Sequence, residues 1–325
     1  MATINLLDST VQASTSEQPG ERPLLREFAS KILAHAQYEG DTLTPISSLK
    51  LFRRTALTSC TSAAYEPSFI LYAQGQKTVH VGESTYICEA GTCQLTSVDM
   101  PVFSQVTKAS VEAPILAIVL KLDMAMVREV LSRQELLAPE ACSGTRGMAI
   151  GRCTRELVVA CLRLVNLLDA PQDIDFMSGL VEREIVYRVL RSPLGKHLRA
   201  IATLGDQSNR TARAITWLKA NYNKPLHIEE LAEMTQMGLS TFHLRFKTLT
   251  QMSPLQYQKR LRLHQARLLM LEKGLDAATA AYEVGYESAS QFSREYRRFF
   301  GRPPKTDVKT RQFDGFGARM ESSIA

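Results

Sequence analysis

The chain has 325 residues, 45% of them hydrophobic and 22% charged, which is typical of a globular protein long enough for two domains of ordinary size. No run approaches the roughly 20 apolar residues of a membrane-spanning helix, and residues 1–20 lack the basic and apolar regions of a secretory signal. These features exclude membrane and exported classes, so we expect a cytoplasmic protein.

The net charge of +6 is unevenly distributed along the chain. Residues 209–312 contain 18 Lys and Arg against 9 Asp and Glu, a net charge of +9, which leaves −3 for the remaining residues. This imbalance indicates that the C-terminal region is built to meet an anionic partner, whereas the N-terminal region is not.

The N-terminal region begins with a segment, residues 1–22, whose Ser, Thr and Gln content suggests a loose tail. From residue 47 to about residue 123, short runs such as FILYAQ, KTVHV and STYICE alternate apolar and polar side chains. Gly75, Gly82 and Gly91 stand where the runs must turn. Short strands at regular spacing predict a small antiparallel barrel or sandwich.

After Asp123 the hydrophobic period becomes helical. The predicted helices cover residues 122–137, 155–170 and 173–193. In the second, apolar side chains recur at spacings of 4, 3 and 4, at Leu157, Cys161, Leu164 and Leu168. Two interpretations of these apolar faces stay open: the helices pack on the barrel, or they pair with a second copy of the chain in a homodimer.

The cysteines form no C-x-x-C pair and no metal-ligand spacing with a histidine, so we expect reduced core residues. They are Cys60, Cys88, Cys93, Cys142, Cys153 and Cys161. Cys88 and Cys93 flank a predicted turn, and a thiol sensor is therefore an alternative to a packed core role.

Beyond a predicted linker at residues 192–209, two segments resemble each other: IEELAEMTQMGLSTFHLRFKTL at 228–249 and AATAAYEVGYESASQFSREYRRFF at 277–300. Each predicts a short helix, a turn containing Gly238 or Gly285, and a second helix. The apolar residues Phe242, Phe246 and Leu249 recur 50 positions later as Phe292, Tyr296 and Phe299. This pattern predicts two helix-turn-helix motifs.

Helical geometry separates the faces of each second helix. The recurring apolar residues share one side and are expected in the core. In the earlier helix Ser240, His243, Leu244 and Lys247 face outward, and in the later one Ser290, Gln291, Arg294, Arg297 and Arg298 do so. An outward leucine is either a tolerated surface residue or an apolar contact for a thymine methyl group.

A helix is predicted between the motifs, over residues 253–274. Ser253 can cap it, Pro254 suits its first position and Gly274 can end it. About 18 helical residues span ~27 Å, so this linker helix can hold two recognition helices roughly one DNA turn apart. One chain would then read two successive major grooves.

These motifs resemble the AraC/XylS family of bacterial transcription regulators, over roughly residues 209–312. The resemblance rests on the segments LAEMTQMGLSTFHLRFKTLTQMSPLQYQKRLRLHQARLLML and AYEVGYESASQFSREYRRFFGRPP. The N-terminal stretches ILYAQGQKTVHVGESTYICEAG and PILAIVLKLD look like the barrel-type sensor domain of one subgroup. The resemblance implies an effector-responsive regulator of transcription, with double-stranded DNA, an unknown small-molecule effector and, for an activator, RNA polymerase as partners.

The resemblance also implies roles for individual residues. Base contacts fall on Ser240, Thr241, His243, Leu244, Ser290, Gln291 and Arg294, and phosphate contacts on Lys247, Arg297 and Arg298. The chain departs from the family at three positions. Gln236 replaces a usual glycine, Gly238 replaces a usual serine cap, and Leu244 replaces the long cation of many relatives.

The predicted fold class is α+β: an N-terminal cupin-like antiparallel β-barrel with trailing helices, then an all-α C-terminal domain with two helix-turn-helix motifs joined by a linker helix. The predicted units are a tail at 1–22, an effector-sensing and dimerisation domain at 23–195, a DNA-binding domain at 209–312 and a tail at 313–325.

The alternative function is a metal-binding or catalytic cupin-like barrel fused to a DNA-binding domain. Its only signal is His80, and a lone histidine on an alternating strand is more often a structural residue than a ligand. No catalytic motif is present, so we predict no enzymatic activity and no cofactor.

Overall fold

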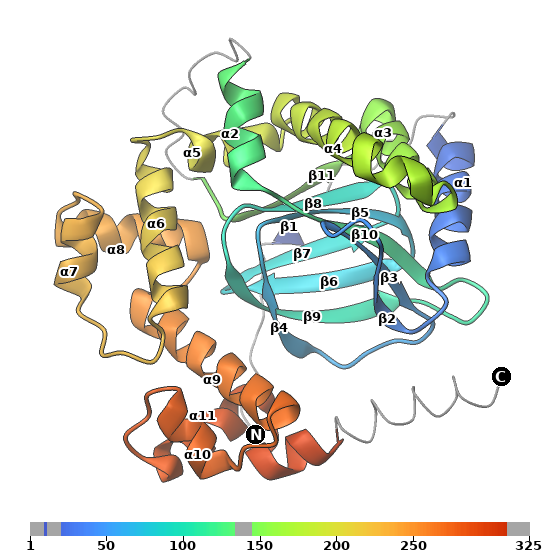
Figure 1. Cartoon of the computed structure of the whole chain (residues 1–325). Helices are drawn as coiled ribbons and strands as arrows, with labels where there is room; N and C mark the ends of the chain where they lie inside the picture. Colours follow the sequence, from blue (N-terminus) through green and yellow to red (C-terminus); the bar gives the residue numbers. More distant parts are fainter. Residues whose placement is uncertain (1–9, 12–20, 134–144, 311–325) are drawn as a thin grey trace.

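The computed structural model describes residues 10–11, 21–133 and 145–310. A β-barrel forms the N-terminal half, and helices at one end of it form the C-terminal half (Figure 1). The predicted tail at 313–325, most of the predicted tail at 1–22, and Cys142 lie outside the described residues.

Two sheets make the barrel, and their strands pair antiparallel except where β1 joins β7. The five-stranded sheet runs β1 (Thr10–Val11), β7 (Ser84–Glu89), β6 (Gln76–Val81), β9 (Met100–Lys108), β4 (Thr61–Tyr65). The six-stranded sheet runs β11 (Met148–Arg152), β8 (Thr92–Thr96), β5 (Ser68–Gln74), β10 (Ile115–Lys121), β3 (Leu49–Arg54), β2 (Gly40–Leu43). The predicted antiparallel barrel is confirmed.

Alternation along the strands divides the barrel into an inner and an outer face. In β6 and β7 the register pairs Lys77 with Cys88 and Val79 with Tyr86. Val79, Tyr86 and Cys88 are buried, so Lys77 stands on the inner face with them. We call the space between the two inner faces the lumen.

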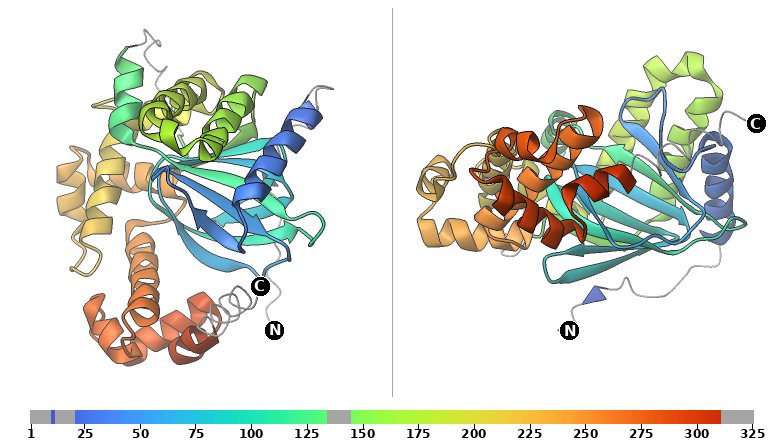
Figure 2. Two further views of the ribbon diagram at one scale, coloured as in Figure 1. Left: turned by 45° about the vertical axis from the view of Figure 1, so that its right-hand side comes forward. Right: turned by 90° about the horizontal axis from the view of Figure 1, so that it is seen from below.

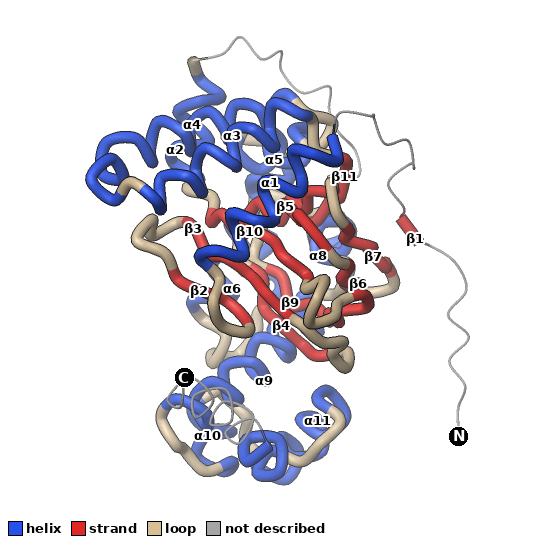
Figure 3. Tube along the Cα trace, turned by 90° about the vertical axis from the view of Figure 1, so that its right-hand side faces the viewer, coloured by secondary structure: helices blue, strands red, loops and turns tan. Residues whose placement is uncertain are grey.

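Helices cover the outer face of the six-stranded sheet (Figure 3). They are α1 (Glu21–His35), α3 (Arg155–Asn166) and α4 (Ile174–Arg191), with α2 (Met124–Ser132) beside α4 and the short 3-10 turns η1 (Leu167–Asp169) and η2 (Pro171–Asp173) between α3 and α4. Leu157, Cys161 and Leu164 are buried in the cluster between these helices and the sheet. This packing occupies the apolar face of α3, as the first of the two interpretations expected.

Besides the edge strands β1 and β2, three elements were not predicted from the sequence. Helix α1 precedes the barrel, and β11 extends the six-stranded sheet by pairing with β8. The predicted linker at residues 192–209 contains a third element, the helix α5 (Gly195–Ala202). Because α5 contacts both α4 and α6, this part of the chain is packed between the two halves rather than extended.

The C-terminal helices confirm the two predicted helix-turn-helix motifs (Figure 2). They are α6 (Gln207–Ala220), α7 (Ile228–Met234), α8 (Leu239–Thr250), α9 (Pro254–Glu272), α10 (Ala277–Glu283) and α11 (Ala289–Phe300). We call α7–α8 the first motif and α10–α11 the second motif. As predicted, Ser253 caps the linker helix α9: Gln256 N donates to Ser253 Oγ over 3.2 Å, and Ser253 N donates to Gln256 Oε1 over 3.1 Å.

The two motifs have different hydrophobic cores. Phe242 and Phe246 of the first motif belong to one cluster with lumen residues such as Val79 and Val102. Phe292 and Tyr296 of the second motif belong to a separate cluster with residues of α9 and α10. The buried core of the first motif is therefore continuous with that of the barrel, whereas the second motif is built mainly on α9.

Each motif turns through one residue in the left-handed conformation. This residue is Gln236 in the first motif, with φ 55°, and Gly285 in the second, with φ 86°. A Cβ atom at Gly285 would lie 2.1 Å from the carbonyl oxygen of Asn223, so a side chain there requires backbone movement. The glycine that relatives carry at Gln236 suits this conformation, because glycine adopts positive φ at no steric cost.

Substitutions at these two positions should therefore have opposite effects. We expect Gly285→Ala to lower the free energy of unfolding by more than about 2 kcal/mol, because it combines a strained φ with a backbone clash. Gln236→Gly should raise it by up to about 1 kcal/mol. Urea unfolding of the full chain followed by circular dichroism measures both. A stable Gly285→Ala variant would contradict the observed turn.

Candidate nucleic-acid interface and the cavity beside it

Helix α8 separates the predicted contact residues from its core. Phe242 and Phe246 are fully buried, whereas Leu244 is 64% exposed. The side chains on the outward side are all exposed or half-buried: Ser240, Thr241, His243, Leu244 and Lys247. N-cap Gly238 makes no side-chain hydrogen bond, as expected from its missing hydroxyl.

Helix α11 shows the same division. Phe292 and Tyr296 are fully buried and Phe299 is half-buried. The predicted contact residues Ser290, Gln291, Arg294, Arg297 and Arg298 are exposed. Ser288 caps the helix by accepting a hydrogen bond from Gln291 N over 3.3 Å.

The cations on these outward faces are electrostatically uncompensated. Lys247, Arg294, Arg297 and Arg298 form no ion pair with any residue that the structure describes. At the flank of this face, by contrast, Glu295 pairs with Lys259 over 2.9 Å and accepts a hydrogen bond from Gln291 Nε2 over 3.4 Å. The positive charge is thus left free where a polyanion could approach the helices.

A buried ion pair fixes the inner side of α11. Arg267 Nε lies 2.9 Å from Asp307 Oδ2, and both side chains are less than a tenth exposed. Tyr296 donates its hydroxyl to the same carboxylate over 2.7 Å. Arg267 also stacks on the ring of Phe300, 3.3 Å from its centroid. These contacts join α9, α11 and the helical residues 304–310 and so fix the direction of the outward face.

Arg302 follows Gly301, the C-cap residue of α11. Its guanidinium donates to Thr310 Oγ1 over 3.2 Å, so it ties the end of α11 to residues 304–310.

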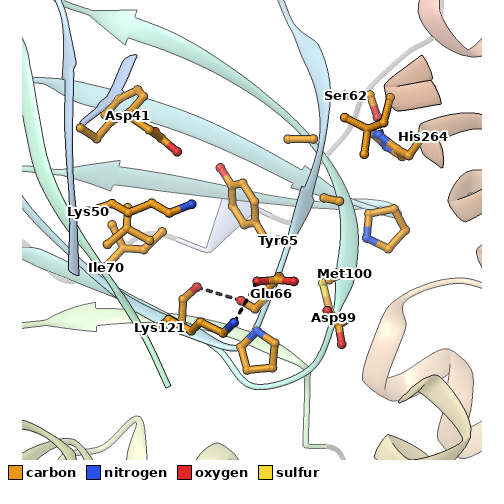
Figure 4. Close-up of a pocket in the computed structure, with 18 of the residues that line it drawn as sticks. Asp41, Lys50, Ser62, Tyr65, Glu66, Ile70, Asp99, Met100, Lys121 and His264 are labelled. Atoms are coloured by element: carbon orange, nitrogen blue, oxygen red, sulfur yellow. Dashed lines mark hydrogen bonds and ion pairs between the residues drawn. The ribbon is translucent and has the colours of Figure 1, made fainter. Parts of the chain in front are cut away.

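A cavity of about 670 Å³ lies between the barrel and the helical half, and no sequence pattern predicted it. Strands β3, β4, β5 and β10 contribute barrel walls, and α6 and α9 contribute the opposite side. Figure 4 shows Tyr65 of β4 pointing into this space and His264 of α9 at its edge. Its apolar lining includes Phe52, Ile70, Tyr72, Met100, Val119, Leu261 and Leu268.

An ion-pair cluster bridges the two halves beside this cavity. Lys219 Nζ of α6 lies 2.6 Å from Asp99 Oδ1 and 2.8 Å from Glu66 Oε1 of the barrel. The hydrogen bond from Lys219 lowers the pKa of Glu66 against the opposing effect of burial. Burial alone would lower the pKa of Lys219, but hydrogen bonds to Asp99 and Glu66 hold it above its usual value. Tyr257 of α9 donates its hydroxyl to the backbone oxygen of Asp99 over 2.8 Å.

The barrel also contacts the C-terminal end of each recognition helix. Gly147 N donates to Leu249 O near the end of α8 over 2.8 Å. The rings of Phe103 in β9 and Phe299 in α11 pack with centroids 5.1 Å apart. His264 Nε2 in α9 is hydrogen-bonded to Ser62 Oγ in β4 at 2.7 Å. Both motifs are therefore positioned by the barrel as well as by α9.

The residues behind the alternative functions have structural partners. His80 faces away from the lumen, and its Nδ1 is 3.0 Å from Thr85 Oγ1. Within residues 21–133 and 145–310, no three His, Cys, Asp or Glu side chains gather where they could hold a metal ion.

Cys60, Cys88, Cys93 and Cys161 form no disulfide bond. Cys88 lies in the lumen cluster and Cys93 in the cluster under the outer helices, so they do not face each other. Burial raises the pKa of Cys88 to about 12, which keeps the thiol protonated. Cys60 departs from the expected core role because it is exposed, ahead of β4.

None of the helices in the described residues is both long and apolar enough to cross a membrane.

Two family models match the chain. The AraC-type transcriptional regulator N-terminus matches residues 45–197, which include the barrel strands from β3 onward. A helix-turn-helix domain matches residues 231–310, which include α8, α9 and the second motif. The two models leave all of α6, including its ion-pair residue Lys219, unmatched.

Curated relatives are similar to part of the chain. The HTH-type transcriptional activator RhaS of Escherichia fergusonii is 28% identical over 174 residues, which are 52% of this chain and 60% of RhaS. The HTH-type transcriptional regulator ArgR of Pseudomonas aeruginosa is 25% identical over 149 residues, 46% of this chain and 45% of ArgR. The matched part thus spans about half the length of these relatives.

The whole fold is similar to that of ToxT from Vibrio cholerae, with a TM-score of 0.54 and 12% identity over 80% of this chain and 97% of ToxT. A second ToxT structure, described as bound to an unsaturated fatty acid, has a TM-score of 0.52 and 11% identity over 80% of this chain and 94% of that one. At this identity the likeness extends to the fold alone.

The ion-pair cluster gives a prediction for Lys219. Lys219→Met should lower the free energy of unfolding by about 1 kcal/mol at neutral pH, because the partly exposed pairs with Asp99 and Glu66 are lost. The pKa of Glu66 is lowered from its ordinary 4.5, so the pair stabilises fully above that value and is lost as the pH falls through the lowered pKa. The difference between variant and parent should therefore shrink in acid.

Denaturant titrations at neutral pH and well below pH 4.5 measure this difference. Lys224→Met is the matched control, because Lys224 is exposed and forms no ion pair with a described residue. A Lys219→Met effect that stays constant across this pH range would show that the ion pairs do not cause it.

Proposed function

Because the chain belongs to the AraC-type family of transcriptional regulators, we propose that it binds specific DNA sequences through both helix-turn-helix motifs and that a small molecule bound beside the barrel controls this binding. The observation that carries the proposal is the pair of outward helix faces. Ten predicted contact residues lie exposed or half-buried on α8 and α11, and their four cations lack ion pairs with described residues.

The spacing of the motifs supports reading of two grooves by one chain. Helix α9 has 19 residues, which at 1.5 Å per residue corresponds to about 28 Å. Recognition helix α8 precedes α9 and recognition helix α11 follows it, and the two lie at opposite ends of α9 (Figure 1). Successive major grooves on one side of DNA are about 34 Å apart, which this arrangement can match once turns are included.

The side chains suit a division of roles. In α11, Ser290, Gln291 and Arg294 lie in the first half of the helix, where a recognition helix contacts base edges. Arg297 and Arg298 lie in its last turn and are assigned to phosphates. In α8 we assign base contacts to Ser240, Thr241, His243 and Leu244 and a phosphate contact to Lys247.

Two arginine variants test this division. Arg294→Ala should weaken binding to the specific operator by about 1–3 kcal/mol and relax discrimination at one base position, because a bidentate base contact is lost. Arg298→Ala should weaken specific and random DNA alike and reduce the salt dependence of binding. Fluorescence anisotropy against the operator and a scrambled duplex, over a series of salt concentrations, measures both.

The operator for these titrations comes from selection of bound fragments out of genomic DNA. Glu283→Ala, on the exposed side of α10, is a control away from the proposed contacts. If Arg294→Ala and Arg298→Ala change specific and random binding equally, the assignment of base and phosphate contacts is wrong.

We place the effector site in the cavity between the halves. A neighbour of the same fold is described as bound to a fatty acid, and family members with this barrel are expected to have effectors. The cavity is lined by both β4 and α9, so a bound molecule contacts the sensor half and the helix that separates the two motifs.

As the relative RhaS is named an activator, we further propose activation of transcription through contact with RNA polymerase in the cytoplasm.

The domain assignment follows the same division. We assign residues 23–195 to effector sensing and residues 209–312 to DNA binding, with α5 as the connection between them.

We also infer that the chain acts by binding and not as an enzyme. Stoichiometric metal in the purified full chain would favour the alternative of a metal-binding or catalytic barrel instead.

A homodimer is supported by an exposed apolar group on α4. Phe176 is 77% exposed, Leu180 50% and Met177 37%, and all three lie on neighbouring turns. Phe176→Ser with Leu180→Ser should shift the dimer toward the monomer in sedimentation velocity, because apolar burial is lost. The control is Leu57→Ser, at a 64% exposed leucine elsewhere. An unchanged monomer–dimer equilibrium would exclude this surface.

A further inference from the structure

Lys77 is one of the lysines that line the cavity, and it lies deeper among apolar side chains than the exposed Lys50 and Lys121. Lys77 belongs to β6 and shares the inner face with Val79 and Val81. Its ammonium nitrogen lies 5.0 Å from the centroid of the Phe52 ring and 5.4 Å from that of Tyr65. The charge is therefore held between two aromatic rings inside the barrel, away from the ion pairs at the cavity mouth.

No carboxylate among the described residues neutralises Lys77. Of the three acidic side chains that line the cavity, Glu66 and Asp99 already pair with Lys219, and Glu66 also lies 3.8 Å from Lys121. The third, Asp41, is exposed on the edge strand β2. Lys77 thus lacks an anion, whereas Lys121 and Lys219 each have one.

A second polar group beside Lys77 is also unsatisfied. The hydroxyl of Tyr65 is buried and has no hydrogen-bond partner in the described structure. Figure 4 shows this hydroxyl directed into the cavity. An unpaired buried hydroxyl and an unpaired ammonium are both costly, and the two rings offset only part of the cost through cation–π attraction.

One ligand chemistry satisfies both groups at once. A carboxylate accepts from an ammonium and from a hydroxyl, and its attached carbon skeleton suits the apolar wall of Ile70, Met100 and Val119. A polyhydroxylated ligand would instead bring several hydroxyls against this apolar wall, where they would lose their hydrogen bonds to water. The lining therefore favours a monoanion with an apolar body.

We propose that the cavity binds a small monocarboxylate, aliphatic or aromatic, whose carboxylate lies against Lys77 and the Tyr65 hydroxyl and whose apolar body extends toward Leu261 and Leu268 of α9. This inference rests on the proposed function, in which a small molecule controls DNA binding, and names the class of that molecule. The body of such a ligand would contact the helix that sets the separation of the two motifs.

Isothermal titration of the full chain with two acids and their neutral counterparts tests the proposal. The pairs are octanoate with octan-1-ol and 3-phenylpropanoate with 3-phenylpropan-1-ol, so that the two arms separate an aliphatic from an aromatic body. We expect at least one acid to bind about tenfold more tightly than its alcohol, as a charge-assisted hydrogen bond predicts.

Lys77→Met should lower the affinity for that acid about tenfold and leave the affinity for its alcohol unchanged. Lys224→Met is the control: Lys224 is exposed and does not line the cavity, so the affinity for the acid should be unchanged. Removing the unpaired cation should leave the melting temperature of the ligand-free variant equal or raised, which shows that any loss is not misfolding.

Tyr65→Phe keeps the ring and removes the hydroxyl, so it should lower the affinity for the acid and leave that for the alcohol unchanged. This variant replaces Lys77→Met as the test if Lys77→Met does not fold. Equal affinities for acid and alcohol, no acid binding, or acid binding that is insensitive to both Lys77→Met and Tyr65→Phe would each overturn the proposal. Operator binding by the same preparation is measured in parallel. If operator binding is sequence-specific but neither acid binds, the assignment as a DNA-binding regulator stands and only the proposed ligand class is wrong.

Discussion

Hydrophobic packing between the barrel lumen and the first motif determines how the two halves are arranged. Val79 and Val102 of the barrel belong to one buried cluster with Phe242, Phe246 and Tyr257 of the helical half. Burying each large apolar side chain contributes roughly 1.5–3 kcal/mol, so exposing this surface would cost far more than breaking the ion pairs around it. Helix α8 is therefore held to the barrel, and the polar contacts adjust that placement.

The second motif is held differently. Its core is separate, and it meets the barrel through the contact of Phe103 with Phe299 and, on α9, the hydrogen bond of Ser62 with His264. These are partly exposed contacts along β4 and β9, the same strands that border the cavity. A ligand that displaced β4 would change the support of the second motif while the first stayed packed. The cavity is thus placed to alter the separation or angle of two recognition helices.

The sequence was sufficient for features that depend on local periodicity. The strands between residues 47 and 123, both motifs and the inward and outward sides of α8 and α11 follow from spacing, and the cap at Ser253 follows from its residue type. The contact roles of those outward residues remain predictions. Helix α1 and strand β11 were missed because their stability comes from packing against the sheet, and a short run such as MAIGR carries no clear period.

The cavity could not have been predicted from local sequence periodicity either. Lys77 and Tyr65 are 12 positions apart and come from different strands, and α9 is nearly 200 residues further along. Nothing in the runs that contain them distinguishes an inward lysine from an outward one until the strand register is known. The pairing of Lys77 with buried Cys88 is what places it in the lumen.

The first motif departs from the family pattern at its turn and cap. These departures are consistent with a motif whose core is shared with the barrel. Gln236 holds a left-handed conformation that glycine would adopt without strain, and Gly238 and His227 cap their helices without side-chain hydrogen bonds. The second motif has the stronger local signals, with Asp276 and Ser288 as hydrogen-bonded caps. A motif that shares its core with the barrel can lose about 1 kcal/mol at a turn or cap and keep its place. The second motif has less support from the barrel, and its turns and caps carry correspondingly more of its stability.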